Sequence, residues 1–375
     1  MPAYHQMGHH SQNLLGEADL SSFAGALVSP VNYVVDEVAE LVEAHQSGTF
    51  DFVLDPQLYF PTSERGHLHE WSYFPSDLDS ADLSSETWWS GLIADLVAVG
   101  TELGCRAIAS PAIVPRRYDN GYFAHSTRVA HSLVEQAPGF RTLQTVLVSL
   151  DELSQPSRAY AIASLVSQTK CDGIYLILVS ETEPRRELSD EEGLKGAMLL
   201  IAALEAASLE VLVGYSSSEL VLWKAAGATS CATGKFFNLR RFTRSRFEEP
   251  SGGGGQLPYW VEESLLSFLR ESDLLRVQQA GLLSEVDDRN PYCEQIFEQI
   301  ADGEPWLALA WRQYMWWFAD IESRLAAGSL EVRTLLQQAE RNWIQLEDQD
   351  ILMEERRNDG TWLRSWRRAL AEYRS

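Results

Sequence analysis

Short apolar runs recur along the first two thirds of the chain, and most of them are followed by a stretch with helical spacing. Seven runs show this pattern: residues 26–30, 52–56, 107–111, 142–149, 173–180, 209–215 and 228–233. Short continuous apolar runs are typical of parallel strands that are buried on both faces. A weaker run at 258–260, with a helix expected at 262–270, supplies an eighth unit. The sequence therefore predicts an α/β fold, a closed (β/α)8 (TIM-like) barrel.

The strand pattern stops before residue 274, and helical spacing continues to the end of the chain. Helices are expected at 291–302, 306–326, 330–347 and 361–374. This part also contains seven of the 12 tryptophans. We predict a barrel domain over 15–273 and a Trp-rich helical C-terminal domain over 274–375. The tryptophans fit either a compact helical core or a face that binds a partner or a second copy, and the sequence leaves both open.

The cysteines and the N-terminus bear on location. Four widely separated cysteines include no C-x-x-C pair, which favours a reducing compartment. Residues 1–15 are polar, and no run approaches the roughly 18 apolar residues of a membrane span. We therefore expect a cytoplasmic protein without a membrane segment.

Charge is distributed unevenly along a chain whose formal net charge is −24. The first 100 residues contain a single Lys or Arg, Arg65. This first half of the barrel is expected to repel polyanions. A basic and aromatic segment at 235–247 follows the apolar run at 228–233. It is the strongest candidate for an anion site, and its predicted members are Gly234, Lys235, Arg240, Arg241 and Arg244.

Loops after the last strands of a barrel often bind phosphate, which supports this assignment. Ala-Thr-Gly-Lys at 232–235 lacks the full spacing of a Walker phosphate loop, so a solvated basic loop is the alternative. A run of glycines at 252–255 predicts a flexible loop over 248–256.

Catalytic candidates lie where predicted strands end, because barrel active sites form at that edge. Asp55 and Gln57 are two residues apart on an extended segment and so point the same way, giving a carboxylate beside an amide. Such a pair can contact the edge of a ring or hold a proton, although Asp55 can also simply cap its loop. Glu181 follows a strongly apolar strand, where desolvation would raise its pKa, and an exposed loop glutamate is the alternative.

Histidines raise the question of a metal. His67 and His69 form an H-x-H pair near Glu70, and imidazole with carboxylate suits zinc. The pair falls in a long loop, and no histidine follows His131 to complete a ligand set. We expect no metal and no other cofactor.

Some segments resemble a known family. Ser-Pro-Val at 29–31, the strand and aromatic tail at 52–61, the segment 66–71 and Gly-Ala-Thr-Ser-Cys at 227–231 are similar in order and spacing to tRNA-guanine transglycosylase barrels. That family's D-S-G-G-F run has no counterpart here, and Ser230 stands where the family has its nucleophilic aspartate. The resemblance implies recognition of a nucleobase or of nucleic-acid phosphate by a divergent, transglycosylase-like nucleic-acid-processing barrel.

Two functions of different classes follow. In the first, the barrel binds a phosphate-bearing ligand, which is a nucleotide or nucleic acid. Asp55 and Gln57 then lie at the mouth, and the 235–247 segment binds the anion. In the second, the barrel is a non-catalytic subunit of a multiprotein assembly that docks its partner through the helical region. Whether the chain is an enzyme is left open, because no complete catalytic motif is present.

Overall fold

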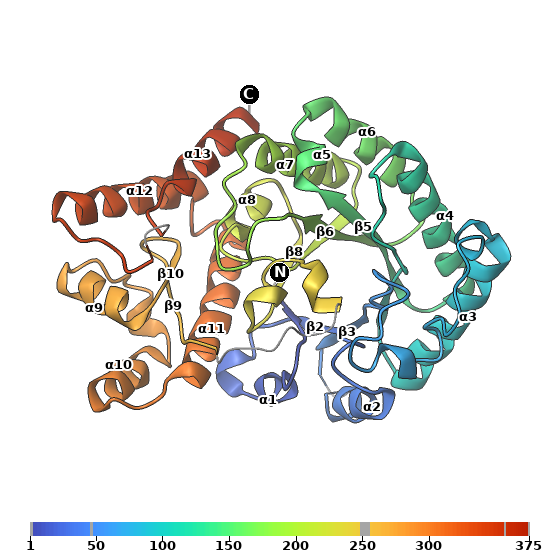
Figure 1. The fold of residues 1–375 in the computed structure, drawn as a ribbon, viewed down its shortest axis with the longest axis horizontal. Helices are drawn as coiled ribbons and strands as arrows, with labels where there is room; N and C mark the ends of the chain where they lie inside the picture. The colour runs from blue at the N-terminus through green and yellow to red at the C-terminus, as the bar shows by residue number, and fades with distance from the viewer. Residues whose placement is uncertain (1–2, 46–47, 248–255, 356–357, 374–375) are drawn as a thin grey trace.

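Eight parallel strands close into a barrel in the order of the sequence, which confirms the predicted fold (Figure 1). The computed structural model describes residues 3–45, 48–247, 256–355 and 358–373. The predicted flexible loop at 248–256 lies outside this set except for Gln256. The barrel strands are β1 (Tyr4–Gln6), β2 (Gly25–Val28), β3 (Asp51–Leu54), β4 (Ala107–Ala109), β5 (Arg141–Ser149), β6 (Gly173–Val179), β7 (Glu210–Gly214) and β8 (Ser230–Thr233).

Helices between the strands form the outer ring of the barrel. Several begin at a side chain that accepts a hydrogen bond from the first turn: Ser85 from the Trp88 amide, and Asp119 from the Tyr122 amide. Such caps satisfy amides that have no partner within the helix. The barrel helices are α1 (Gln12–Leu15), α2 (Val35–Ala44), α3 (Glu86–Leu103), α4 (Asn120–Gln136), α5 (Leu150–Leu153), α6 (Pro156–Val166), α7 (Glu191–Ala206) and α8 (Leu220–Ala225), with the short 3-10 turn η1 (Ala18–Leu20).

The first barrel strand, β1, has no apolar run and was not predicted. Tyr4 pairs with Ala232 of β8, and His5 with Thr233, so this strand closes the barrel. Its side chains are buried although they are polar. The Tyr4 hydroxyl donates to Asp51 at 2.8 Å, and Gln6 accepts from the Tyr175 hydroxyl at 3.2 Å. Buried polar side chains of this kind are stable because partners replace water.

The prediction of an eighth barrel strand at 258–260 followed by a helix at 262–270 is wrong. With β1 in place the barrel is already closed, and this segment forms a two-stranded antiparallel hairpin outside it. Its strands are β9 (Trp260–Glu262) and β10 (Ser267–Leu269).

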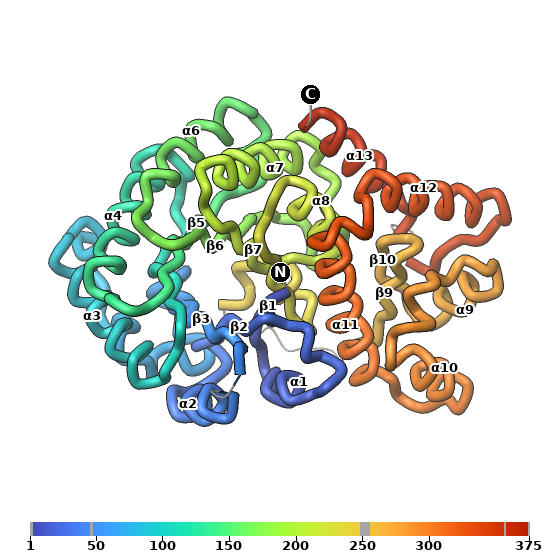
Figure 2. The backbone as a smooth tube through the Cα atoms, turned by 180° about the vertical axis from the view of Figure 1, so that it is seen from behind, coloured from blue at the N-terminus to red at the C-terminus, as the bar shows by residue number. Residues whose placement is uncertain are grey.

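The helix α11 occupies the place of the barrel's eighth helix. In the part of the chain between β8 and β9 that the structure describes there is no α-helix, and α11 packs against β8, α8 and η1 (Figure 2). One continuous apolar cluster therefore joins barrel residues such as Leu176 and Val213 to Phe318 of α11. The C-terminal helices are α9 (Glu271–Gln279), α10 (Cys293–Asp302), α11 (Leu307–Ala326), α12 (Val332–Asp348) and α13 (Trp362–Tyr373).

Most tryptophans of the C-terminal region lie inside the chain's own core. Five of the seven are buried, and Trp311 and Trp316 are partly exposed. The last helix, α13, packs against α7, where the Trp366 indole donates to the carbonyl of Leu188 at 2.6 Å. Basic side chains of α13 contact acidic residues of this same chain: Arg368 lies 3.4 Å from Glu191. Docking of a partner through this region stays a prediction.

Within the described ranges, no helix is both long and apolar enough to cross a bilayer.

A buried ion pair fastens α11 to the barrel and yields a prediction. Lys224 and Glu322 lie 3.3 Å apart, are 7% and 0% exposed, and the Glu322 carboxylate also accepts from the Cys231 amide of β8. Burial raises the pKa of Glu322 to about 6, while Lys224 and the amide lower it.

Lys224→Met leaves a buried carboxylate without its cation, and we expect a loss of about 3–5 kcal/mol in the free energy of unfolding, measured with urea. Lys170→Met, in an exposed pair with Glu135, is the control and should change it by less than about 1 kcal/mol. Similar losses in both variants would contradict this role for Lys224.

Candidate functional site

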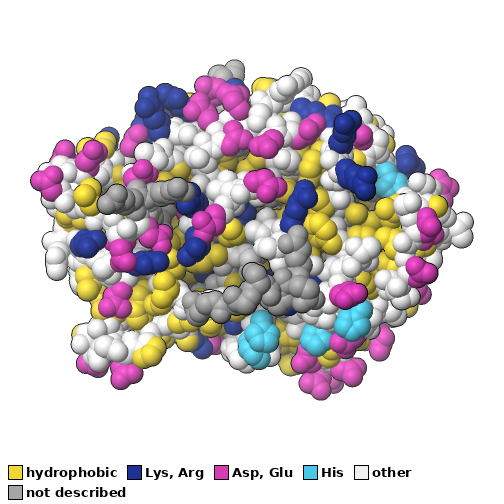
Figure 3. Space-filling view, viewed as in Figure 1, with side chains coloured by type: hydrophobic (Ala, Val, Ile, Leu, Met, Phe, Trp, Pro, Cys, Tyr) yellow, Lys and Arg dark blue, Asp and Glu magenta, His cyan; other side chains and the backbone are white. Residues whose placement is uncertain are grey.

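The carboxyl ends of the barrel strands open into a cleft of about 1020 Å³. Its walls come from the loops after β1, β2, β3, β6 and β8, and from the C-terminal region through Tyr259, Leu307 and Trp311. In Figure 3, which shows the same face as Figure 1, histidine side chains lie along the lower edge of this face and Lys and Arg side chains lie to its left and above. The cleft is where active sites form in barrels of this type.

The cleft is lined by cations and by no carboxylate. Among the described residues of its wall there is no Asp or Glu, although the chain contains 54 of them. The charged or titratable residues that line it are Arg65, Arg185, Lys235, Arg240, Arg246, His9 and His67. A surface of one sign inside a concave, partly desolvated space attracts ions of the opposite sign. The mouth is therefore electrostatically suited to an anion.

Lys235 is the predicted anion-site residue that best keeps this role. Its Nζ lies 4.9 and 4.6 Å from the ring centroids of Phe236 and Trp311, which contact each other edge-on, and donates to the carbonyl of His10 at 3.2 Å. Burial, and then the charge of Arg312, lower the pKa of Lys235 to about 8. An anion placed beside Nζ would relieve both effects by favouring the charged form.

Arg240 lines the cleft, but its guanidinium is committed to the protein. It donates to the carbonyls of Gly234 at 3.1 Å and Lys235 at 2.8 Å, and it stacks 3.4 Å from the ring centroid of Tyr314. Burial lowers its pKa to about 10. Arg240 therefore shapes the loop that presents Lys235. Gly234 serves the same packing, because a Cβ there would lie 2.5 Å from the carbonyl oxygen of Gln6.

The other two predicted anion residues lie elsewhere. Arg241 is buried, lies 3.5 Å from the carboxylate of Glu219, and donates to the carbonyls of Glu183 and Arg186. Its charge is therefore already balanced within the chain. Arg244 is exposed and is not part of the cleft wall.

Arg246 is the residue that connects the cleft to the barrel interior. It belongs to the basic segment 235–247 that the sequence analysis singled out, although it was not among the predicted members of the anion site. Its Nη2 donates to Ser29 Oγ and Asn32 Oδ1, both at 2.8 Å, while its buried Nε has no partner in the described structure. Burial lowers its pKa, and its charge in turn lowers that of Asp55. Arg65 was also missed as a site residue, although its place as the lone cation of the first 100 residues was a usable signal.

Asp55 lies at the centre of a buried polar cluster directly after β3. Its carboxylate accepts from the hydroxyl of Tyr59 at 2.8 Å, the amide of Gln57 at 3.0 Å and the hydroxyl of Tyr175 at 3.3 Å. Burial raises the pKa of Asp55 to about 6, because these donors and Arg246 offset only part of the desolvation. A carboxylate with such a pKa can accept and return a proton near neutral pH.

Gln57 lies beside Asp55, as predicted, and ties two loops together. Its backbone has a φ of 50°, and its Oε1 accepts from the Val31 amide at 3.1 Å. Its Nε2 has no partner, and the same holds for Tyr215 Oη and Gln6 Nε2 within the described chain. Buried donors without partners are costly, so this cluster is prepared to bind acceptor atoms.

The Asp55 cluster is covered by aromatic side chains of the loop after β8. Phe242 and Phe247 lie edge-on to the ring of Tyr59, with centroids 5.2 and 5.4 Å away. Asp55 and Gln57 are 1% and 0% exposed, so neither lines the open cleft. The structure thus brings Asp55 and Gln57 together but separates them from solvent by one layer.

Glu181 does not join this cluster. It is exposed and does not line the cleft, so the desolvation that was expected to suit it to proton transfer is absent. Of the H-x-H pair, His67 lies at the cleft edge, where its Nδ1 is 2.7 Å from Glu70. Within the described chain, one group of carboxylates is close enough to hold a metal, namely Glu191, Glu192 and Glu372. Lys195 lies 2.7 Å from Glu372 and already balances part of that charge.

Comparison with known proteins does not assign the site. No protein-family model matches this chain, and no curated protein matches it. Its function must therefore be inferred from the geometry and charge of the mouth.

The raised pKa of Asp55 yields a prediction about stability. Between pH 4 and 6 the native state holds the Asp55 proton more tightly than the unfolded state does, so wild type loses stability as pH rises through this range. The change from the ordinary value of 3.8 to about 6 corresponds to about 3 kcal/mol. Asp55→Asn removes this dependence, so urea unfolding should show the variant gaining on wild type by up to that amount between pH 4 and 7. Asp77→Asn, at an exposed position, is the control. A constant difference between wild type and Asp55→Asn over this range would contradict the assignment.

The different positions of Arg240 and Arg244 yield a second prediction about stability. Arg240→Met leaves two carbonyls without donors and removes the stack on Tyr314, and we expect a loss of about 2 kcal/mol or more in the free energy of unfolding. Arg244→Met changes an exposed side chain and should stay within about 0.5 kcal/mol of wild type. Thermal or urea unfolding of both variants measures this, and equal effects would show that Arg240 does not hold the loop.

Proposed function

We propose that this chain binds a phosphate-bearing ligand, a nucleotide or nucleic acid, at the carboxyl-terminal mouth of the barrel. The observation that supports this most directly is that the described residues of the cleft wall include five Lys and Arg side chains and no carboxylate, in a chain with a net charge of −24. Phosphate is the anion for which arginine clusters and barrel mouths are most often built.

The cluster beneath the cleft suits the uncharged part of such a ligand. Donor groups of Tyr215 and of its neighbours Gln57 and Arg246 lie near the single carboxylate of Asp55. This arrangement offers several donors and one acceptor, which matches a heterocycle edge with carbonyl oxygens and a ring N–H. Asp55, with a pKa of about 6, is the group we assign to proton transfer if the ligand reacts here.

The resemblance to tRNA-guanine transglycosylase barrels belongs to this proposal. Asp55 and Gln57 lie in one of the segments that carry the resemblance, and Cys231 lies in another. Divergent transglycosylase-like processing of a base is the reaction class that this resemblance suggests, with Asp55 as the carboxylate nearest to the ligand. Two basic residues outside those segments, Arg185 and Arg246, would hold the phosphate side.

The proposal is tested by binding across a salt series. We expect transfer RNA or single-stranded DNA to bind with an affinity that falls as salt rises, because phosphate contacts release counterions. Arg65→Glu with Arg185→Glu should weaken binding at least tenfold and reduce the salt slope by about 2, since each cation accounts for about one phosphate contact. Fluorescence anisotropy measures both quantities. The buried Arg240 and Arg241 are unsuitable for this test, because their replacement would disturb the fold.

The control carries the same charge change away from the mouth. Arg128 on α4 and Lys170 before β6 are exposed, and Arg128→Glu with Lys170→Glu should leave binding within about twofold of wild type. No binding of any nucleic acid or nucleotide at low salt, or equal losses in both double variants, would overturn the proposal.

A further inference from the structure

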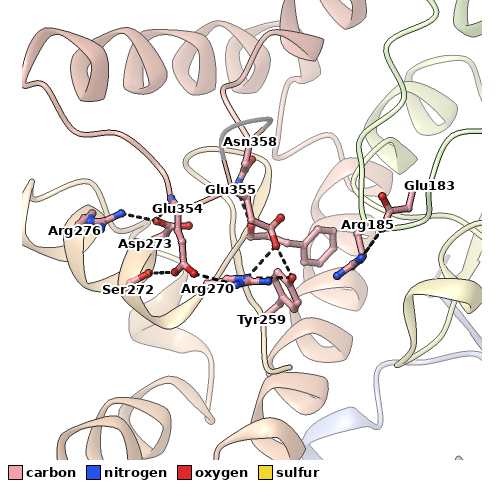
Figure 4. Close-up of polar contacts among 11 residues, drawn as sticks. Glu183, Arg185, Tyr259, Arg270, Ser272, Asp273, Arg276, Glu354, Glu355 and Asn358 are labelled. Atoms are coloured by element: carbon pink, nitrogen blue, oxygen red, sulfur yellow. Dashed lines mark hydrogen bonds and ion pairs between the residues drawn. The ribbon is translucent and has the colours of Figure 1, made fainter. Parts of the chain in front are cut away.

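A second cavity lies beside the mouth cleft. It has a volume of about 580 Å³, within the range of small-molecule sites, and it is formed by the loop after β6, the β9–β10 hairpin and the chain at the start of α13. Figure 4 shows part of its polar lining, namely Glu183, Arg185, Tyr259, Arg270, Glu355 and Asn358, together with neighbouring residues.

The two cavities meet at a shared wall. Arg185 and Tyr259 line both of them. The Tyr259 hydroxyl is held by Glu355 at 2.7 Å, and the Arg185 guanidinium by Glu183 at 2.7 Å, so both side chains have a defined position (Figure 4). A ligand that leaves the mouth on this side therefore passes over Arg185 and Tyr259.

The second cavity differs from the first in its charge. Its described wall contains three arginines and three glutamates, whereas no carboxylate is among the described residues that line the mouth cleft. Burial raises the pKa of one of these glutamates, Glu187, to about 8, so it adds little negative charge at neutral pH. Most of these charges are matched within the chain: Arg186 lies 3.5 Å from Glu183, and Arg270 lies 3.0 Å from Glu355. Because the described arginines of this wall are already paired with glutamates, they offer little free charge to a phosphate, and the cavity is suited to an uncharged, polar group.

One donor in this cavity has no partner. Trp362 is 5% exposed and lines the cavity, and its indole Nε1 makes no hydrogen bond in the described structure. Of the other described polar side chains of the wall, Asn358 accepts from Ser267 and donates to the carbonyl of Phe268, whereas the buried Oε2 of Glu187 has no partner. The rings of Phe268 and Trp362 add apolar surface. An aromatic wall with one free N–H fits a planar heterocycle that carries an acceptor atom.

We propose that the second cavity is a subsite for a further nucleoside of the same ligand. The phosphate that links it to the nucleotide in the mouth would lie at Arg185, the cation shared by both cavities. The ligand is then a single-stranded polynucleotide of at least two residues, and not a free mononucleotide. This inference rests on the proposed function, because it needs a nucleotide in the mouth.

The test compares ligand length in two matched tryptophan variants. The probes are the nucleoside 5′-monophosphates and mixed-sequence single strands of ten nucleotides, as DNA and as RNA, with binding followed by calorimetry. For wild type we expect the ten-nucleotide strand to bind at least tenfold more tightly than the best monophosphate. Trp362→Phe removes the free indole N–H, and we expect it to weaken binding of the strand about tenfold while monophosphate affinity stays unchanged.

Trp343→Phe is the matched control. Trp343 packs against Trp362, with ring centroids 5.7 Å apart, but its indole already donates to the carbonyl of Leu265 at 3.0 Å. We expect this variant to lose thermal stability and to keep the affinity for the strand. Loss of strand binding in Trp343→Phe as large as in Trp362→Phe would assign the effect to the fold and overturn the subsite.

Failure of this inference and failure of the proposed function give different results. If monophosphates bind but length adds nothing, or if Trp362→Phe leaves the preference for the strand intact, the second subsite is wrong and the mouth site stands. If neither monophosphates nor strands bind at low salt, both are wrong.

Discussion

The pairing of β1 with β8 is the constraint on which the rest of the structure depends. Tyr4 and His5 align with Ala232 and Thr233, and this short contact closes the sheet into a barrel. Closure directs the loop after β8 across the mouth, where it meets the loops after β1 and β2. The cations of that loop, and the cover over Asp55, owe their position to three residues of polar sequence at the start of the chain.

Burial of charge at the mouth works against the stability of the fold. Lys235 and Arg240 both have lowered pKa values because they are desolvated, and Asp55 has a raised one for the same reason. Among the described residues that line the cleft, no carboxylate offsets the cations, although Arg185 is paired with Glu183 outside that wall. Such costs are common where a protein is built to receive a ligand, because the ligand supplies the missing partner. The helix α11 offsets part of the cost by placing Tyr314 under Arg240 and Trp311 beside Lys235.

The sequence predicts the repeating part of this fold well and its polar parts poorly. Seven strands follow from apolar runs, since burial on both faces leaves a strong pattern. The strand at Tyr4 has no such run because its side chains are buried through hydrogen bonds, which depend on partners distant in the chain. The hairpin at Trp260 has strand composition, but composition does not state which sheet a strand joins.

The candidate site shows the same division. Asp55 and Gln57 could be placed together because they are two positions apart in the sequence, although the chain is not extended there: Gln57 has a φ of 50°, and its amide donates to Asp55. The separate roles of Arg240, Arg241 and Arg246 could not be predicted. All three lie in the same basic segment, and only the folded loop decides which of them line the cleft. The exposure of Glu181 likewise depends on how the loop after β6 leaves the barrel.

The position of α11 has a consequence for how the chain is made. The last barrel strand ends at Thr233, but the helix that covers it begins at Leu307, more than seventy residues later. During synthesis all eight strands leave the ribosome before that cover exists, so the apolar side of β8 and α8 has no partner until α11 emerges. The outer wall of the barrel is therefore completed by a helix that lies outside the repeated β/α units and is synthesised after them. Truncation of the chain ahead of α11 would remove part of that wall as well as the C-terminal helices.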